Sequence, residues 1–340
     1  AGAPVLFVCH LMGLVFFGLL IGGAELVQVY RHRRFRVAVE RGLVLAAVFA
    51  VPVVLYAVSD LRHLGGDAAF LPIGQKLLQL VTVFANYDGR LDLATAGFAF
   101  GLPLLCLLSR RGSVPGPAGC TIALLLIGFL AMPYGWKGTF RLDTRFAVML
   151  GFMLFAGFVP ARWPLGLRRG VAGAIVVLFA VRMGLLGIAW AAHRTDLADL
   201  RAVLEPVRPG QAVYVAEAGL REAPAYWAAN PGWRLLSNGV RMDEHLGALV
   251  LIEHRAYWPF EFDEVSQQPM RTRSAYRRLA ERVGSLPDRA AAAVANVCGF
   301  DYVLLLAADA VPRLPNDRFT LADRSGFAAL YTIKACRETP

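Results

Sequence analysis

The segment MPYGWKGTFRLDTRF, residues 132–146, joins two apolar runs at 121–131 and 146–159. It carries four charged side chains, which are Lys137, Arg141, Asp143 and Arg145. Charges close to a bilayer are costly, so they serve either as topology signals or as parts of a site. In an extended loop the last three would alternate and point to one side. The segment is therefore either a solvated turn with aromatic anchors or a binding site for an anionic, membrane-borne substrate.

The composition indicates a membrane protein. The chain has 340 residues, of which 57% are hydrophobic and 18% charged, and its mean hydropathy is +0.51. Ordinary soluble domains have ~45–50% apolar and ~25% charged residues. The surplus apolar residues are gathered in blocks, and the basic residues behind the net charge of +10 lie beside those blocks. This favours a membrane surface over nucleic acid as the partner. The sequence has no glycine-rich phosphate loop, zinc-ligand spacing or GxSxG elbow.

Six apolar stretches approach the length of about 20 residues that a membrane span requires. We expect the spans at 4–26, 42–59, 93–108, 118–131, 146–159 and 170–190. Arginines concentrate in the alternate loops 30–41, 109–117 and 160–169. The positive-inside rule makes these loops cytoplasmic. The loops 60–92 and 132–145 and the C-terminal region then face outward.

The outward loop 60–92 contains a predicted helix at 73–86. Polar residues recur there at helical spacing, and leucines occupy the other faces. We expect this helix to lie in the outer membrane interface. Several carboxylates flank it, but nothing in their spacing singles one out as a site residue.

The character of the chain changes after residue 190, so we divide it into a transmembrane helical region, 1–190, and a second domain, 191–340. Strand-like apolar runs alternate with helical patterns in the second domain. The expected strands are 212–216, 248–252, 302–306 and 328–333, and the expected helices are 193–209, 273–283 and 288–297. The predicted fold is therefore an α-helical polytopic membrane region of about six spans followed by a small α/β extracytoplasmic domain.

The second domain shows no catalytic constellation in its sequence. His245 and His254 have no third ligand in view, so we expect no metal site. The aromatic stretch 256–270 either fills a core or forms a loop that returns to the membrane. Cys298 and Cys336 lie beside two expected strands, and a disulfide would join them if these strands are neighbours.

The charged segment resembles a loop of a known enzyme class. The run from Pro133 to Phe146 has a proline, a glycine and an Asp-x-Arg-Phe at the start of a span. It is similar to the late outer-face loop of bacterial multi-spanning glycosyltransferases of the C-type fold, the protein-mannosyltransferase-like superfamily. Such proteins often end in an outer α/β domain. Segments that look like parts of that domain are RAYWPF at 255–260, QQP at 267–269 and FDYV at 300–303.

This resemblance, which covers most of the chain, implies a transferase that uses a polyprenyl-phosphate-linked sugar at the outer face of the bacterial inner membrane. The C-terminal domain would then be periplasmic. Lys137, Arg141 and Arg145 would stabilise the phosphate leaving group, and Asp143 would orient an arginine or contact a sugar hydroxyl. The catalytic base of such enzymes lies in an early outer loop, so we expect it to precede Ala1 in a longer protein. The resemblance assigns no cofactor, and it leaves a divalent metal and the oligomeric state open.

A second class of function fits the same residues. The chain could be a non-catalytic membrane subunit of polysaccharide assembly or export, with an outer docking domain. A transporter is disfavoured, since the sequence has no paired broken helices and no charge relay in mid-span. An upstream segment with a carboxylate-bearing outer loop would favour the enzyme.

Overall fold

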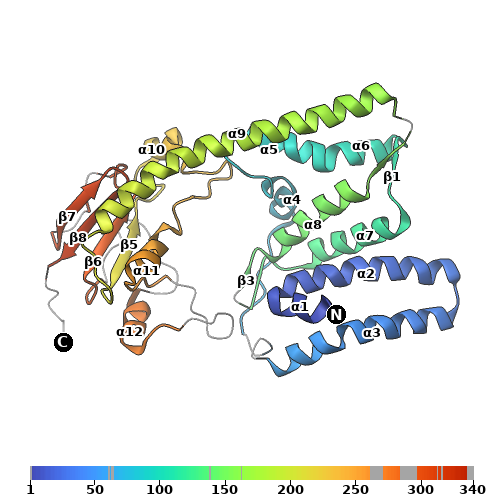
Figure 1. Ribbon diagram of the computed structural model, residues 1–340, viewed down its shortest axis with the longest axis horizontal. Helices are drawn as coiled ribbons and strands as arrows, with labels where there is room; N and C mark the ends of the chain where they lie inside the picture. Colours follow the sequence, from blue (N-terminus) through green and yellow to red (C-terminus); the bar gives the residue numbers. More distant parts are fainter. Residues whose placement is uncertain are drawn as a thin grey trace. The chain divides into compact units, whose positions relative to one another are not determined.

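The chain forms two compact units, Ala1–Arg182 and Met183–Pro340. Figure 1 shows the computed structural model. The division falls inside α9 (Leu165–Leu204), a helix of 40 residues that also contains the predicted domain boundary after residue 190. The structure describes residues 2–59, 62, 65–137, 139–161, 163–260, 271–283, 297–311, 313–314 and 317–334.

The first unit is mainly helical in its described part. Its helices are α1 (Gly2–Cys9), α2 (Leu11–His32), α3 (Phe35–Val58), α4 (Ile73–Thr82), α5 (Gly89–Ala96), α6 (Leu102–Leu108), α7 (Gly116–Ala131), α8 (Leu142–Gly157) and the first part of α9. A π-helical turn, Gly97–Gly101, joins α5 to α6. Two antiparallel pairs of short strands complete it, β1 (Gly112–Ser113) with β4 (Val159–Pro160) and β2 (Gly135–Trp136) with β3 (Thr139–Phe140).

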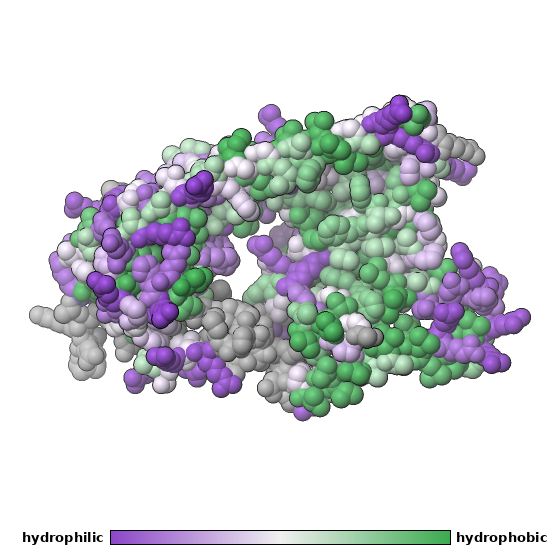
Figure 2. Space-filling view, in the orientation of Figure 1, coloured by the Kyte–Doolittle hydropathy of each residue, from purple (hydrophilic) through white to green (hydrophobic). Residues whose placement is uncertain are grey.

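Four helical stretches among the described residues are long and apolar enough to cross a membrane. They are Leu11–His32, Phe35–Val58, Gly89–Leu108 and Leu165–Leu204. Helices α7 and α8 have only 16 residues each. Figure 2 shows apolar side chains over much of the visible face of these helices and polar ones at the turn between α2 and α3. The structure therefore indicates a membrane protein with four candidate spans, and the predicted count of about six is not confirmed.

The N-terminal apolar run forms two helices where a single span at 4–26 was predicted. His10 interrupts the run with an extended backbone, φ −168° and ψ 110°. Its side-chain Nδ1 accepts a hydrogen bond from the Met12 N–H at 3.2 Å, which caps α2. A polar side chain that caps a helix thus breaks an apolar pattern that is otherwise continuous.

The predicted loop at 30–41 is mostly helical. Helix α2 continues to His32 and α3 begins at Phe35, so two residues, Arg33 and Arg34, make the turn. Arg33 adopts a left-handed backbone with φ 48°, and its N–H donates to the Val29 carbonyl. The arginines of this region therefore lie in the turn and in the helical residues on either side of it.

Glycines allow close contact between neighbouring helices of the first unit. Gly23 of α2 faces Thr121 of α7, and a Cβ at position 23 would lie 2.3 Å from the threonine Oγ1 and 2.9 Å from its backbone nitrogen. Gly128 of α7 likewise accommodates the ring of Phe146 in α8. Small residues at such contacts are typical of helix packing in membranes. The buried core around them comprises Met12, Leu125, Phe129, Leu142, Phe146, Ala147 and Leu150.

The second unit contains a four-stranded sheet in the order β5-β6-β8-β7. Strand β5 (Val213–Glu217) runs parallel to β6 (Tyr302–Leu306), whereas β8 (Ala328–Ile333) pairs antiparallel with both β6 and β7 (Phe319–Ser325). The two strands predicted after residue 300 are confirmed at both ends. The first predicted strand lies one residue later than expected.

The central strands are buried on both faces, which explains their continuous apolar sequences. Leu304 and Leu306 belong to a core that also holds residues near the end of α9, which are Leu200, Val203 and Leu204. Val303 and Leu305 alternate with them and belong to a second core, against which α12 (Ser274–Val283) packs. The sheet therefore separates two hydrophobic layers.

The strand predicted at 248–252 is wrong. The segment is helical, because the 3-10 turn Leu246–Ala248 leads directly into α11 (Leu249–His254). Val250 is fully buried, while Ile252 is 69% exposed, so the apolar run is only partly covered. A short apolar run cannot by its periodicity alone distinguish a strand from a helix.

Other expectations for the second domain have mixed outcomes. The helix expected at 193–209 is the C-terminal part of α9, which ends five residues earlier at Leu204, and the one at 273–283 is α12. The helix expected at 288–297 lies, except for its last residue, outside the described residues. Strand β7 and helix α10 (Pro224–Ala229) were not predicted. Five of the seven residues of β7 are exposed, so its sequence carries little apolar signal.

The aromatic stretch and the cysteines are partly described. Tyr257 and Trp258 are buried in the two cores, which confirms the packing interpretation for these residues, while 261–270 lies outside the described residues. Cys298 is disulfide-bonded. Its predicted partner Cys336 lies outside the described residues, so that pairing stays a prediction. The free cysteines in the described part are Cys9, Cys106 and Cys120.

Candidate functional site

The charged segment 132–146 forms a short hairpin that leads into α8. Its first strand is also held by a neighbouring segment, since the Ala69 N–H donates to the Gly135 carbonyl at 2.8 Å. Lys137 and Arg141 both have a left-handed backbone, with φ 50° and 58°. These two positions turn the chain at the hairpin tip and immediately before α8. The segment therefore has a defined backbone despite its short strands.

The expectation that three charged residues alternate on one side of an extended loop is wrong. Leu142 begins α8, so Arg141 precedes the helix while Asp143 and Arg145 lie in its first turns. Residues two apart in a helix do not face each other. The start of the helix instead places the Asp143 carboxylate in the interior, whereas Arg141 is exposed and Arg145 half-buried.

Lys137 is half-buried and contacts uncharged groups. Its Nζ lies 5.3 Å from the centre of the Trp136 ring. It donates to the Tyr56 hydroxyl at 3.4 Å and to the Arg62 carbonyl at 3.3 Å. The ammonium group can donate three hydrogen bonds, and these acceptors are neutral. They therefore do not neutralise the positive charge of Lys137 at the hairpin.

Arg141 is exposed and Arg145 is half-buried. Neither guanidinium forms a hydrogen bond or ion pair with any residue that the structure describes. A guanidinium keeps its charge at any physiological pH and offers five N–H donors in a planar fork. The two arginines are therefore available to an anion at the start of α8.

Asp143 is fully buried and faces Lys76 of α4, not an arginine. Its Oδ2 lies 3.9 Å from the Lys76 Nζ. Its Oδ1 accepts a hydrogen bond from the Thr144 N–H at 2.8 Å, within the first turn of α8. The expected pairing of Asp143 with Arg141 or Arg145 is thus replaced by a buried ion pair with a residue 67 positions earlier.

Lys76 also closes the end of α7. Its Nζ donates to the carbonyls of Leu130 and Met132, at 3.0 and 2.5 Å, and lies 5.9 Å from the centre of the Phe129 ring. The last carbonyls of a helix have no intrahelical partner, and a cation there is favourable. An anion such as Asp143 is favourable at a helix start. Lys76 therefore links the end of α7 to the beginning of α8.

Helix α4 turns its polar side inward. Lys76 and Gln79 are buried, and the Gln79 Oε1 accepts a hydrogen bond from the Thr144 hydroxyl at 2.9 Å. Leu77 and Leu78 are 48% and 58% exposed. The helix predicted within 73–86 exists, but its polar face contacts α8. A lipid surrounding explains this arrangement, because exposed leucines are favourable there.

A second buried ion pair lies between α5 and α9. Arg182 donates to the Asp92 carboxylate at 2.7 Å, to the Thr95 hydroxyl at 3.0 Å and to the Phe84 carbonyl at 2.8 Å. Sequence reasoning missed both Lys76 and Arg182. Each is a single cation within an apolar helical pattern, and that is the signal that could have found them.

The arrangement is suited to binding an anion. Among the described residues no group of three or more histidine, cysteine, aspartate and glutamate side chains could hold a metal ion. Comparison with known proteins adds no relative, because no family model, curated protein or solved structure matches the chain. The function is therefore inferred from the residues themselves.

Proposed function

We propose that the chain binds a polyprenyl-phosphate-linked sugar at the outer face of the bacterial inner membrane and takes part in transferring that sugar to an acceptor. The observation that carries the proposal is the pair Arg141 and Arg145, two guanidiniums at the start of α8 without an anionic partner in the described part of the chain. Lys137 adds a positive charge on the same hairpin. The resemblance of the segment to the glycosyltransferase loop supports this substrate class.

A phosphate group suits these positively charged side chains better than an uncharged sugar does. Guanidinium forks bind phosphate oxygens through two parallel hydrogen bonds, and a lysine acts as a point charge. The dipole of α8 also favours an anion at the N-terminus of the helix. Asp143 is a positioning residue in this proposal, because its buried carboxylate holds Lys76 and the start of α8 and is not accessible to a substrate.

The proposed transfer is a substitution at the anomeric carbon. The acceptor hydroxyl oxygen forms a bond to that carbon while the bond from the carbon to the phosphate oxygen breaks. The polyprenyl phosphate leaves with the electron pair, and the hydroxyl proton passes to a general base. Negative charge that builds on the leaving phosphate is stabilised by Arg141 and Arg145. The base lies outside the charged segment, since its one carboxylate, Asp143, is fully buried.

The test is transfer from a polyprenyl-phosphate sugar by the full-length protein carrying Arg145→Ala in membranes, with the abundance of each variant measured alongside. Loss of one preorganised donor lowers turnover by about 100-fold or more. Arg145→Lys recovers only part of the loss, because the fork is replaced by a point charge. Arg90→Ala is the control, since Arg90, like Arg145, is an arginine in the first turn of a helix. We expect that control to retain normal turnover.

Two outcomes would change the assignment. Normal turnover of Arg145→Ala at normal abundance would return the segment to a solvated turn. Saturable binding of polyprenyl phosphate by the unaltered full-length protein, lost in Arg145→Ala but without any transfer, would instead support the non-catalytic subunit.

A further inference from the structure

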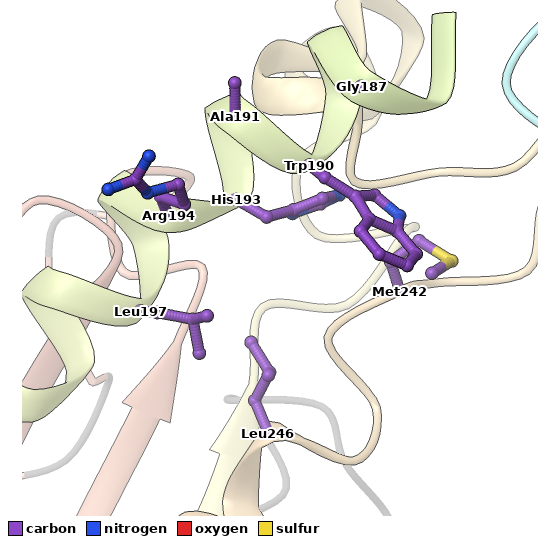
Figure 3. Close-up of a pocket in the computed structure, with 8 residues that line it drawn as sticks. All are labelled: Gly187, Trp190, Ala191, His193, Arg194, Leu197, Met242 and Leu246. Carbon is purple, nitrogen blue, oxygen red and sulfur yellow. The ribbon is translucent and has the colours of Figure 1, made fainter. Parts of the chain in front are cut away.

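The second unit contains a pocket beside its part of α9. Its volume is about 500 Å³, and its lining residues are Gly187, Trp190, Ala191, His193, Arg194, Leu197, Met242 and Leu246. Figure 3 shows Leu197 on α9 and Leu246 on the facing segment pointing toward the same space, with Trp190 near Met242. Two of the lining side chains are polar or charged and the others are apolar. The pocket therefore suits a ligand that is mostly hydrocarbon.

The helix side of the pocket continues an apolar stripe. Met183, Gly187 and Trp190 recur at spacings of four and three residues, so they lie on one face of α9, followed by Arg194 and Leu197. Met183 is 49% exposed and Trp190 is 65% exposed. Because α9 is one of the helices able to cross a membrane, an acyl chain could reach the pocket along this stripe without passing through water.

Arg194 supplies the charge at the pocket. It is exposed, and its guanidinium has no hydrogen bond or ion pair with the residues that the structure describes. The other ionisable lining residue, His193, has its Nδ1 3.6 Å from the Asp196 carboxylate. A ligand with one anionic group next to a hydrocarbon chain therefore complements the pocket. Tryptophan next to a basic residue is typical of the level of the lipid headgroups.

We propose that this pocket binds an anionic glycerophospholipid of the surrounding bilayer. One acyl chain lies between the side chains of Trp190, Leu197 and Leu246, and the lipid phosphate contacts Arg194. The site uses none of the residues of the charged hairpin and is independent of the sugar-transfer proposal. It would tie the second unit to the membrane surface at residues 187–197 of α9.

The experiment uses the full chain in lipid nanodiscs that contain phosphatidylglycerol with a photoreactive acyl chain. A parallel sample contains phosphatidylcholine with the same acyl chain. After illumination, peptide mass spectrometry locates the labelled residues. The phosphate of either lipid can accept a hydrogen bond from Arg194, but only phosphatidylglycerol carries a net negative charge. We expect it to label peptides covering 187–197 and 242–246 about two- to fivefold more than phosphatidylcholine, because net attraction to an exposed charge contributes up to about 1 kcal/mol.

Gly187→Phe tests the pocket itself. A Cβ at position 187 meets no atom within 4 Å, so the helix tolerates the ring, which occupies the pocket. We expect about tenfold less labelling. Gly173→Phe is the matched control, because its Cβ also meets no atom within 4 Å and it lies roughly 21 Å away along the same helix. The control should be labelled normally.

Arg194→Gln tests the headgroup contact and should remove the preference for phosphatidylglycerol, whereas Arg221→Gln, an exposed arginine elsewhere in the unit, should keep it. Thermal unfolding of each variant separates loss of binding from loss of folding. Equal labelling of the pocket by the two lipids in the unaltered chain would overturn the proposal. Unchanged labelling of folded Gly187→Phe would overturn it as well.

Discussion

The Nζ of Lys76 in α4 lies 3.9 Å from the Oδ2 of Asp143 in α8, and the two residues are 3% and 0% exposed. A single charge at this depth would be costly, whereas a pair with further hydrogen bonds compensates much of the cost. The pair joins α4 to the point where α7 ends and α8 begins. It therefore holds the frame from which the hairpin with Lys137 and Arg141 extends.

Breaking this pair should destabilise the first unit. In Asp143→Ala the buried Lys76 ammonium keeps its two carbonyl acceptors but has no carboxylate beside it. Loss of one partner of a buried ion pair costs about 3–5 kcal/mol of stability. The double variant Lys76→Met, Asp143→Ala should be less destabilised than the sum of the two single variants, because neither charge is then left unpaired. Unfolding of the full chain in detergent measures these differences. Additive effects would show that the two side chains are not coupled.

Two adjacent glycines give a second prediction. Gly23→Ala introduces a Cβ that would lie 2.9 Å from the backbone nitrogen of Thr121, so α2 and α7 must move apart, and we expect a loss of about 1–3 kcal/mol. Gly22→Ala is the control, since its Cβ meets no atom within 4 Å and alanine favours the helix by up to ~1 kcal/mol. Thermal unfolding in one detergent compares them. Equal stability of the two variants would contradict the close packing.

The two strands at the centre of the sheet could be predicted because strands buried on both faces consist of consecutive apolar residues. Residues 302–306 and 328–333 are of this kind. Strand β7 has no continuous apolar run, since it lies at the sheet edge and is mostly exposed. The run 248–252 was ambiguous because five apolar residues fit either a strand or a helix.

The candidate site could be predicted only in part. The charges of the segment 132–146 are visible in the sequence, and its two arginines have no described partner. The partner of Asp143 could not be predicted, because Lys76 is 67 residues away and lies on a helix that was expected only to lie in the membrane interface. In a protein surrounded by lipid, the polar face of that helix packs inward. Pairing between distant polar residues depends on tertiary packing, which local patterns do not record.

A buried ion pair in the second unit can be compared with an exposed one. The buried Arg241 guanidinium donates to the Asp243 carboxylate and to the Ala218 carbonyl, and lies 4.3 Å from the centre of the Trp227 ring. Burial alone would lower the pKa of Arg241, but the hydrogen bonds and charge of Asp243 outweigh it and raise the pKa. The arginine therefore stays charged inside the unit and depends on its carboxylate partner.

The exposed pair joins Arg201 of α9 to Glu253 of α11 at 2.7 Å, with side chains that are 55% and 29% exposed. The hydrogen bond from Arg201 lowers the pKa of Glu253. The small contribution of this ion pair to stability is therefore fully present at pH values above the ordinary pKa of glutamate. It is lost as the pH falls through the lowered pKa of Glu253. Exposed pairs of this kind contribute about 0.2–1 kcal/mol.

We therefore expect losses of stability of very different size at neutral pH for two carboxylate deletions in the same unit. Asp243→Ala should lower the free energy of unfolding by about 1.5–3 kcal/mol, because it removes charged hydrogen bonds of the buried Arg241 and leaves Glu217, 3.7 Å away, as its remaining carboxylate. Glu253→Ala should change it by less than about 1 kcal/mol, because water replaces the lost contact. Denaturant unfolding of the full chain, followed by a fluorescence probe attached to the second unit, measures both. Similar losses in the two variants would show that burial does not set the strength of these pairs.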